Sequence, residues 1–340
     1  SPKFETQAEA YRYIIDSLDV ANGKYDLKKG LQFNTNGDKM YCTSGSDLEG
    51  ILKWKKFTNS LRLRALLRVI DSQELGDMAK AELKKMLASP ETYPVFESNE
   101  DNAKVHISGV APDEAPMTRP SDLSSYKSLS EFFIDNLKNW NDPRLPIFAK
   151  TATNKDPETG KNVTSYIGLP SGYDVEPTIT ASSPNATYLA TAPQDIQCLT
   201  YAEVLFIKAE LAQRGIIDAD AKSLYEQAVT AAITQWGVEM PEDYFSNPKT
   251  AYDGTLKRIM EQKFYALFFI DFQQWFEYNR TGYPDVPKGP GVDPSVHMPY
   301  RFKYPAILQR MNRENYLKAV ESMGGDDFNT KLIWQTRPEL

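Results

Sequence analysis

The sequence predicts a mainly α-helical protein in which tetratricopeptide-like helical hairpins form a scaffold, with long irregular loops and little β-structure between them. Three observations carry this prediction. Helix-start motifs recur along the chain, apolar residues follow them at helical spacing, and two long stretches are rich in proline, asparagine, aspartate and serine. A chain of 340 residues can form one large domain, and we expect residues 1–340 to do so.

Four capping boxes begin predicted helices. In such a box a Ser or Thr side chain accepts a backbone N–H three residues on, and a Glu at that position accepts the first backbone N–H in return. Apolar residues at helical spacing follow each box, which favours real caps over chance matches. The pairs are Thr6 with Glu9, Ser46 with Glu49, Ser128 with Glu131, and Thr200 with Glu203.

Three helices are predicted in the first part of the chain. The first ends near Gly23, the second runs from about residue 49 to 69, and the third covers residues 75–87. Each has an apolar side that would face the core. The inward residues expected are Ala10, Ile14, Leu18 and Ala21 in the first helix, and Leu52, Phe57, Leu61, Leu66 and Val69 in the second.

Two irregular stretches interrupt the helices. Residues 90–125 have room for a short hairpin at 104–110, and a second stretch, 141–194, follows a short helix predicted at 129–140. Both are dense in turn-forming residues. Loops of this length in a compact protein usually have a function.

Further helices are predicted at residues 201–214, 219–236, 253–279 and 313–323. Three glycines, which tolerate the left-handed conformation of a helix end, close the first three: Gly215, Gly237 and Gly282. The first two helices form a predicted antiparallel hairpin. Its packing positions fit a tetratricopeptide unit, although a generic hairpin fits as well; they are Leu205, Ala209, Ala221, Tyr225 and Ala228.

The stretch at residues 261–286, "EQKFYALFFIDFQQWFEYNRTGYPDV", is unusually aromatic. Asp271 interrupts its apolar run, so it is too short for a bilayer span. A helix that is apolar nearly all round is buried, which predicts a core segment rather than a ligand platform. One face would carry Phe264, Phe268 and Trp275, the next Tyr265, Phe269, Phe272 and Phe276, and a narrow polar edge Gln262, Gln273 and Glu277.

Composition and motifs exclude several classes of function. A net charge of −7 argues against nucleic-acid binding, which needs a basic surface. The two histidines, His106 and His297, have no metal-ligand spacing, and no glycine motif for nucleotide phosphates is present. We therefore expect no catalytic histidine, no metal site and no cofactor. Cys42 and Cys198 leave a disulfide open.

Two charged features have alternative interpretations. The acidic turns near Glu100 and Asp326 could bind calcium, but neither follows the EF-hand pattern and solvated turns are favoured. A basic helix face could meet an acidic partner or a membrane, but a solvated face is favoured. Its residues are Lys53, Lys56, Arg64 and Arg68.

Six aromatic residues of the irregular stretches are the candidate ligand-binding residues. A flat ring can pack on the apolar face of a sugar, while neighbouring amides and carboxylates bond its hydroxyl groups. The alternative is that the rings pin the loops to the scaffold. The residues are Tyr93, Phe96 and Tyr126 in the segment 90–126, and Tyr166, Tyr173 and Tyr188 in the segment 160–190.

Seven segments, in this order and spacing, resemble the SusD/RagB-like nutrient-binding lipoproteins of Bacteroidetes. They are GILKWKKFTNSLRLRALLRVID, DPRLPIFA, YIGLPSG, LTYAEVLFIKAELAQRG, AITQWGV, IMEQKFYALFFIDFQQWFEYNRTGYPDV and RFKYPAILQRMNRENYLKAVESMGGDDFNTKLIW.

The resemblance implies a scaffold of four tetratricopeptide-like hairpins and no catalysis. It also implies a lipid-anchored outer-membrane protein at the cell surface that captures oligosaccharide or peptide for import through a SusC-like TonB-dependent transporter. Family members are usually longer, so the resemblance implies that the lipidated cysteine and the first hairpin lie outside this chain. It assigns no ligand residue individually.

Two other classes of function remain as alternatives. A glycoside hydrolase would need two carboxyl groups facing each other across a cleft. A tetratricopeptide adaptor would need a continuous concave groove of regular repeats, which the two long irregular stretches interrupt.

Overall fold

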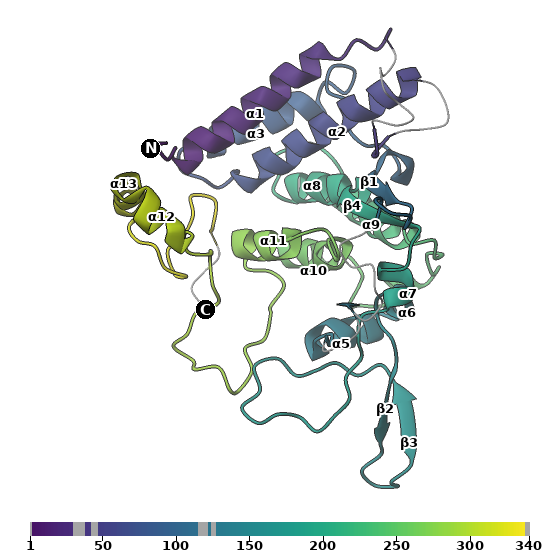
Figure 1. Cartoon of the computed structure of the whole chain (residues 1–340). Coiled ribbons are helices and arrows are strands. Elements are labelled where there is room, and N and C mark those ends of the chain that lie inside the picture. The colour runs from purple at the N-terminus through teal and green to yellow at the C-terminus, as the bar shows by residue number, and fades with distance from the viewer. Residues whose placement is uncertain (1, 30–37, 42–46, 115–121, 124–126, 337–340) are drawn as a thin grey trace.

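Helical layers build the protein in the computed structural model, which describes residues 2–29, 38–41, 47–114, 122–123 and 127–336. The helices α1, α2 and α3 lie over α8 and α9, which lie over α10 and α11 (Figure 1). Strands in the described part form only two two-stranded sheets. The predicted mainly α class is therefore confirmed.

The first layer contains α1 (Gln7–Lys24), α2 (Asp47–Arg68) and α3 (Gly76–Leu87). The box of Thr6 and Glu9 caps α1 as predicted; Ser46 lies outside the described residues. The predicted inward face of α1 is wrong at Ile14, which is 45% exposed whereas Ile15 is fully buried; its other members, Ala10, Leu18 and Ala21, are half-buried. Ala8, Ile15 and Asn22 form the buried stripe. Asn22 belongs to it because its amide oxygen accepts a hydrogen bond from Asn59 on α2.

A long-range strand pair replaces the predicted local hairpin at 104–110. After the 3₁₀ turn η1 (Asn99–Asp101), β1 (Ala103–Ile107) pairs in antiparallel fashion with β4 (Gln194–Leu199). The prediction was wrong about the partner, because the sequence of a single strand does not identify the strand with which it pairs. This pairing joins the middle of the first irregular stretch to the end of the second.

The N-cap of helix α5 (Glu131–Asn139) lies two residues later than the predicted cap. The side chain of Ser130, rather than that of Ser128, accepts the N–H of Phe133. The stretch predicted to be irregular then contains short elements, namely α6 (Leu145–Phe148), β2 (Ala152–Lys155), β3 (Asn162–Ser165) and α7 (Ala186–Leu189).

The central hairpin consists of α8 (Tyr201–Gln213) and α9 (Ala221–Thr234), followed by the 3₁₀ turn η2 (Tyr244–Ser246). Thr200 caps α8 as predicted, but the carboxylate of Glu203 bonds to Arg64 instead of completing the box. Of the predicted packing residues, Ala221 is half-buried and the others are buried: Leu205, Ala209, Tyr225 and Ala228.

The aromatic segment forms two helices, α10 (Leu256–Ala266) and α11 (Gln273–Thr281), so the single predicted helix is wrong. Phe269 and Asp271 in the intervening turn have φ values of 66° and 44°, which no helix allows. Gln274 on α11 donates a hydrogen bond to the carbonyl of Phe264 and so satisfies one end of α10.

The interior of the aromatic segment is only partly as predicted. Tyr265 and Leu267 are buried, and Phe264, Phe268 and Phe269 pack against the core that includes α5, α8, α9 and α10. Phe272, in contrast, is 55% exposed. The supposed polar edge is also wrong for two residues, because Gln262 and Glu277 are buried.

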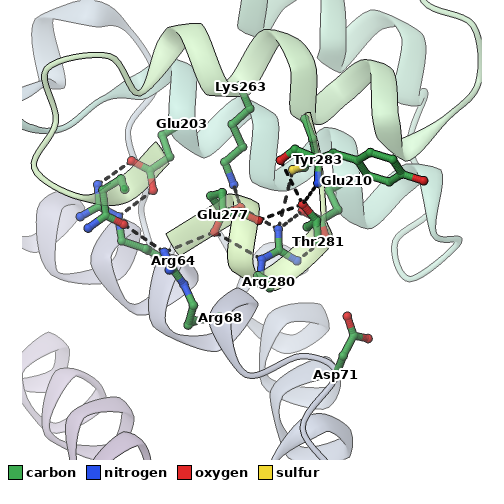
Figure 2. Close-up of polar contacts among 12 residues, drawn as sticks. Arg64, Arg68, Asp71, Glu203, Glu210, Lys263, Glu277, Arg280, Thr281 and Tyr283 are labelled. Atoms are coloured by element: carbon green, nitrogen blue, oxygen red, sulfur yellow. Dashed lines mark hydrogen bonds and ion pairs between the residues drawn. The ribbon is translucent and has the colours of Figure 1, made fainter. Parts of the chain in front are cut away.

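Buried ion pairs explain why Glu277 lies in the interior rather than on a polar edge (Figure 2). The carboxylate of Glu277 lies 2.7 Å from Lys263 Nζ and 2.7 Å from Arg280 Nη2, with Arg68 Nη2 at 3.2 Å. Neither interpretation of the basic face of α2 therefore holds. Arg64 and Arg68 point inward to Glu203 and Glu277, while Lys53 pairs with Glu49 and Lys56 with Glu97 and Asp101.

The last helices are α12 (Ala306–Met311), which was not predicted, and α13 (Arg313–Met323), which was. They lie beside the start of the chain, where Asn312 donates a hydrogen bond to the carbonyl of Pro2 (Figure 1). No helix in the described ranges has the length and apolar character that crossing a bilayer requires.

Candidate functional site

A surface cavity of about 460 Å³ is the candidate site. It lies where α7, β1, β4, the end of α9 and the turn between α10 and α11 converge. The walls combine aromatic rings, carboxamides and one ion pair, which is the mixture that ligand sites for polar molecules with apolar faces use. The residues used below are Tyr188, Trp236, Phe269, Lys104, Asp195 and Gln235.

Tyr188 presents its ring because α7 is a single helical turn with one buried side. Ala186 and Leu189 are buried, and the Asn185 side chain caps the turn by accepting the N–H of Thr187. Tyr188 is directed outward and is 56% exposed. A tyrosine ring fixed on a capped turn offers stacking area at small entropic cost.

Trp236 and Phe269 form an aromatic wall supported by the core. The Trp236 ring packs edge-on against Phe148 with centroids 5.1 Å apart. Phe268 contacts both Phe148, at 4.7 Å, and Phe269, at 5.3 Å. The wall is therefore held from behind and does not depend on the ligand for its position.

Phe269 is held in the left-handed backbone region, with φ at 66°. An aromatic L-residue rarely adopts this conformation, because its Cβ approaches the following carbonyl, at a cost of about 1–2 kcal/mol. Such strain persists only where the surroundings enforce it and is concentrated at functional sites. Here it places an aromatic side chain on the cavity wall.

An ion pair forms the polar side of the cavity. Asp195 on β4 lies opposite His106 on β1, and its carboxylate is 2.8 Å from Lys104 Nζ and 2.9 Å from His106 Nδ1. Burial would raise the pKa of Asp195, but the hydrogen bonds from Lys104 and His106 outweigh it and lower that pKa. Asp195 is therefore an ionised hydrogen-bond acceptor.

Two buried polar atoms of the lining have no hydrogen-bond partner in the described part of the chain. They are Trp236 Nε1 and Gln197 Oε1. Each such atom costs about 1–3 kcal/mol. Together with the strain at Phe269, they indicate a region that is not optimised for stability alone.

Of the five predicted aromatic residues that lie in the described part of the chain, the structure brings one, Tyr188, into this cavity. Tyr173 is 40% exposed, on a chain segment held by a hydrogen bond from Gly291 to Gly172. Tyr166 is half-buried against the core. Tyr126 lies outside the described residues.

Two of the predicted ligand residues, Tyr93 and Phe96, contact the scaffold beneath the segment 90–126. Tyr93 is half-buried, with the Arg62 guanidinium 5.8 Å and the Lys85 ammonium 5.5 Å from its ring centroid. Phe96 is fully buried in the core of α1, α2 and α3. The prediction for Phe96 is corrected, because a ring with no exposed surface cannot contact a ligand.

Sequence reasoning missed Phe269 and Trp236 as lining residues. Trp236 directly precedes the helix-ending Gly237, a position that was visible in the sequence. Phe269 had no such signal, because no glycine or proline marks the turn between α10 and α11. Phe269 is half-buried and packs against the core that includes α5, α8, α9 and α10.

The acidic turns considered for calcium are occupied by protein groups. Asp101 pairs with Lys56 at 2.9 Å, and Asp326 pairs with Arg301 at 2.9 Å. Within the described ranges, no group of three or more metal-ligating side chains occurs. Cys198 is a free, half-buried thiol, and Cys42 lies outside the described residues.

Comparisons with known proteins agree with this architecture. The profile of a SusD-like family, described as "Starch-binding associating with outer membrane", matches residues 1–305. No curated protein sequence matches the chain significantly.

Three solved structures illustrate the similarity in fold. A chitin-binding protein is 24% identical with a TM-score of 0.80, over 99% of this chain and 74% of that one. A Bacteroides vulgatus protein described as a "putative outer membrane protein" involved in nutrient binding is 25% identical with a TM-score of 0.79. The match covers 99% of this chain and 77% of that one. A SusD homolog from Bacteroides fragilis is 25% identical with a TM-score of 0.76, over 98% and 76%.

Proposed function

Because this chain belongs to the SusD-like family, we propose that it is a non-catalytic binding protein that captures an oligosaccharide at the bacterial outer membrane. The family description names starch binding and association with the outer membrane. The proposal assigns capture to the cavity formed by Tyr188, Trp236 and Phe269.

The observation that carries this proposal is the strained Phe269 in the same cavity as the exposed ring of Tyr188. Sugars have apolar faces that pack on rings and hydroxyl groups that bond to amides and carboxylates. Gln194, Gln235 and Asp195 supply such polar groups in the same lining. A cavity of this kind suits a neutral sugar better than a purely apolar ligand.

Binding is favoured over glycoside hydrolysis by the charges of the cavity. Hydrolysis uses two carboxyl groups, one of which must be protonated to act as the acid. Asp195 is the single carboxylate among the described lining residues, and its pKa is lowered by the hydrogen bonds from Lys104 and His106. An ionised, ion-paired carboxylate is poorly suited to donate a proton.

The wider role proposed here follows the family. The protein would be lipid-anchored at the cell surface and would pass its ligand to a SusC-like TonB-dependent transporter. Both irregular segments contribute to capture in this proposal: the segment 90–126 supplies Lys104, and the segment 160–190 supplies Tyr188. Tyr173, exposed on the second segment, is proposed as a secondary contact for a longer ligand. A peptide is the alternative ligand.

Calorimetric titration with a panel of starch and chitin oligosaccharides and a peptide mixture tests the proposal. We expect saturable binding of an oligosaccharide without release of reducing ends. Tyr188→Ala should lower the affinity about tenfold, equivalent to ~1.4 kcal/mol, because a stacking ring is lost. Tyr13→Ala, which removes a ring 73% exposed on α1, is the matched control and should bind normally.

Three outcomes would refute the proposal. They are binding of peptides alone, cleavage of the oligosaccharide, and equal affinities of the Tyr188→Ala and Tyr13→Ala variants. Each would point to a different ligand class, a different activity or a different site.

A further inference from the structure

A second cavity, of about 440 Å³, lies on another part of the molecule. It is formed by the last turn of α3, the middle of α8 and the connection between α8 and α9. Its apolar lining comes from Leu87, Ile216, Ile217 and Leu224, and its polar lining includes Lys84 and Lys208. It shares no lining residue with the cavity of Tyr188.

Lys208 is the unusual member of this lining. The residues before and after it on α8, Ile207 and Ala209, are fully buried, and Lys208 itself is half-buried. Burial lowers the pKa of its ammonium group, which Glu97 only partly offsets. Within the described ranges, no carboxylate lies within ion-pair distance of its Nζ.

Two other lysines with little exposure each form close ion pairs with carboxylates. Lys56 lies 2.7 Å from Glu97 and 2.9 Å from Asp101, and Lys263 lies 2.7 Å from Glu277. A partly desolvated cation without a counter-ion is unfavourable, and the binding of an anion relieves that cost. Lys208 is therefore a half-buried cation with no carboxylate beside it in the part of the chain that the structure describes.

The residues around Lys208 indicate the charge and the apolar character of a ligand that would fit this cavity. The cavity lies between the C-terminal turn of α3 and the N-terminal turn of α9, whose dipoles have opposite effects on an anion. Lys84 and Lys208 outnumber the one carboxylate of the lining, Asp218. The apolar side chains require that the rest of the partner be apolar too.

We propose that this cavity binds a small amphiphilic carboxylate, with its carboxylate on Lys208 and its apolar chain on Ile216, Ile217 and Leu224. The site is separate from sugar capture and gives the protein a second ligand. Octanoate is the probe, and octanol is the neutral ligand of equal chain length.

Calorimetric titration of both probes tests this proposal. Octanoate should bind saturably at one site, more tightly than octanol, and Lys208→Met should weaken octanoate about tenfold or more, because a charge-assisted hydrogen bond is lost. The methionine keeps an apolar stem, so octanol binding should not change. Lys222→Met, at an exposed lysine of α9, is the matched control and should bind octanoate normally.

The variant is expected to fold, because it removes a half-buried unpaired charge. Its thermal midpoint should equal or exceed that of the wild type. The proposal is overturned if octanol binds as tightly as octanoate, if no saturable binding occurs, or if Lys208→Met binds octanoate normally. Tyr188→Ala should leave octanoate binding unchanged, so this test is independent of the sugar site.

Discussion

Arg280 Nη1 and Nη2 lie 2.7 and 2.6 Å from the two carboxylate oxygens of Glu210, and neither side chain is exposed to solvent. This two-point ion pair joins α11 to α8, and Glu277 and Lys263 extend it to α10 (Figure 2). The orientation of α11 therefore depends on buried charges. That orientation also fixes the turn that holds Phe269.

Removal of one partner from this network should be strongly destabilising. Arg280→Met leaves the carboxylates of Glu210 and Glu277 buried without their main partner, and we expect a loss of about 3–5 kcal/mol in the free energy of unfolding. Urea unfolding followed by circular dichroism measures it. In the Arg280→Met background, Glu210→Gln should lower the free energy of unfolding by less than it does in the wild-type protein, because the two side chains interact.

The matched control is Arg12→Met, at an exposed arginine of α1. It should change stability little. Equal effects of the two substitutions would show that the ion pair does not anchor α11.

Stability should fall at acidic pH because of Glu277. Burial alone would raise its pKa, but Arg280, Lys263 and Arg68 outweigh burial and hold the pKa well below the usual 4.5. This stability is fully present above the pKa of unfolded glutamate and is lost as the pH falls toward the folded value. We expect urea midpoints to decline from about pH 5 downward.

Glu277→Gln should lower stability at neutral pH and flatten its decline in acid. Glu176→Gln, at an exposed glutamate, should leave the pH profile as in the wild type. If Glu277→Gln retains the full acid dependence, the assignment to Glu277 fails.

The strain at Phe269 predicts that glycine is a more stable replacement there than alanine, the reverse of the usual order. Phe269→Ala and Phe269→Gly both lose the ring, but only glycine tolerates a φ of 66° freely. The glycine variant should therefore be more stable than the alanine variant by about 1 kcal/mol. At Phe268, which is not in the left-handed region, alanine should be the better replacement. The same order at both positions would argue against strain.

Substitutions at Phe96 and Tyr188 should affect different properties, stability in the first case and ligand binding in the second. Phe96→Ala removes a fully buried ring and should destabilise the protein by about 3–5 kcal/mol, because a cavity remains. Tyr188→Ala should leave the unfolding free energy nearly unchanged and weaken sugar binding. Thermal unfolding and calorimetry on both variants measure this contrast, which would be refuted if Phe96→Ala were stable.

Local patterns predicted much of the scaffold. The box of Thr6 and Glu9, the cap at Thr200 and the helix-ending glycines Gly215, Gly237 and Gly282 lie where the sequence placed them. These signals work because capping and left-handed turns depend on a few neighbouring residues. Long-range features could not be predicted in this way, and β1 pairs with a strand that no local pattern identified.

The interior of α11 was mispredicted for a related reason. Hydrophobic periodicity treats charged residues as outward, so Glu277 was placed on a solvent edge although it is buried. Its burial depends on Lys263, on the preceding helix α10, and on Arg68, from the distant helix α2. The candidate cavity was missed in part because Phe269 lines it from a turn that the sequence did not mark. Tyr188 was predicted as a ligand residue from its irregular sequence context, and the structure places it in the candidate cavity on the short helix α7.

The position of a bound oligosaccharide tests the central claim most directly. A crystal structure of the protein with the oligosaccharide that titrates best should show a sugar ring against Tyr188 and Phe269, with polar contacts to Asp195 or Gln235. A sugar bound elsewhere, with this cavity left empty, would contradict the account.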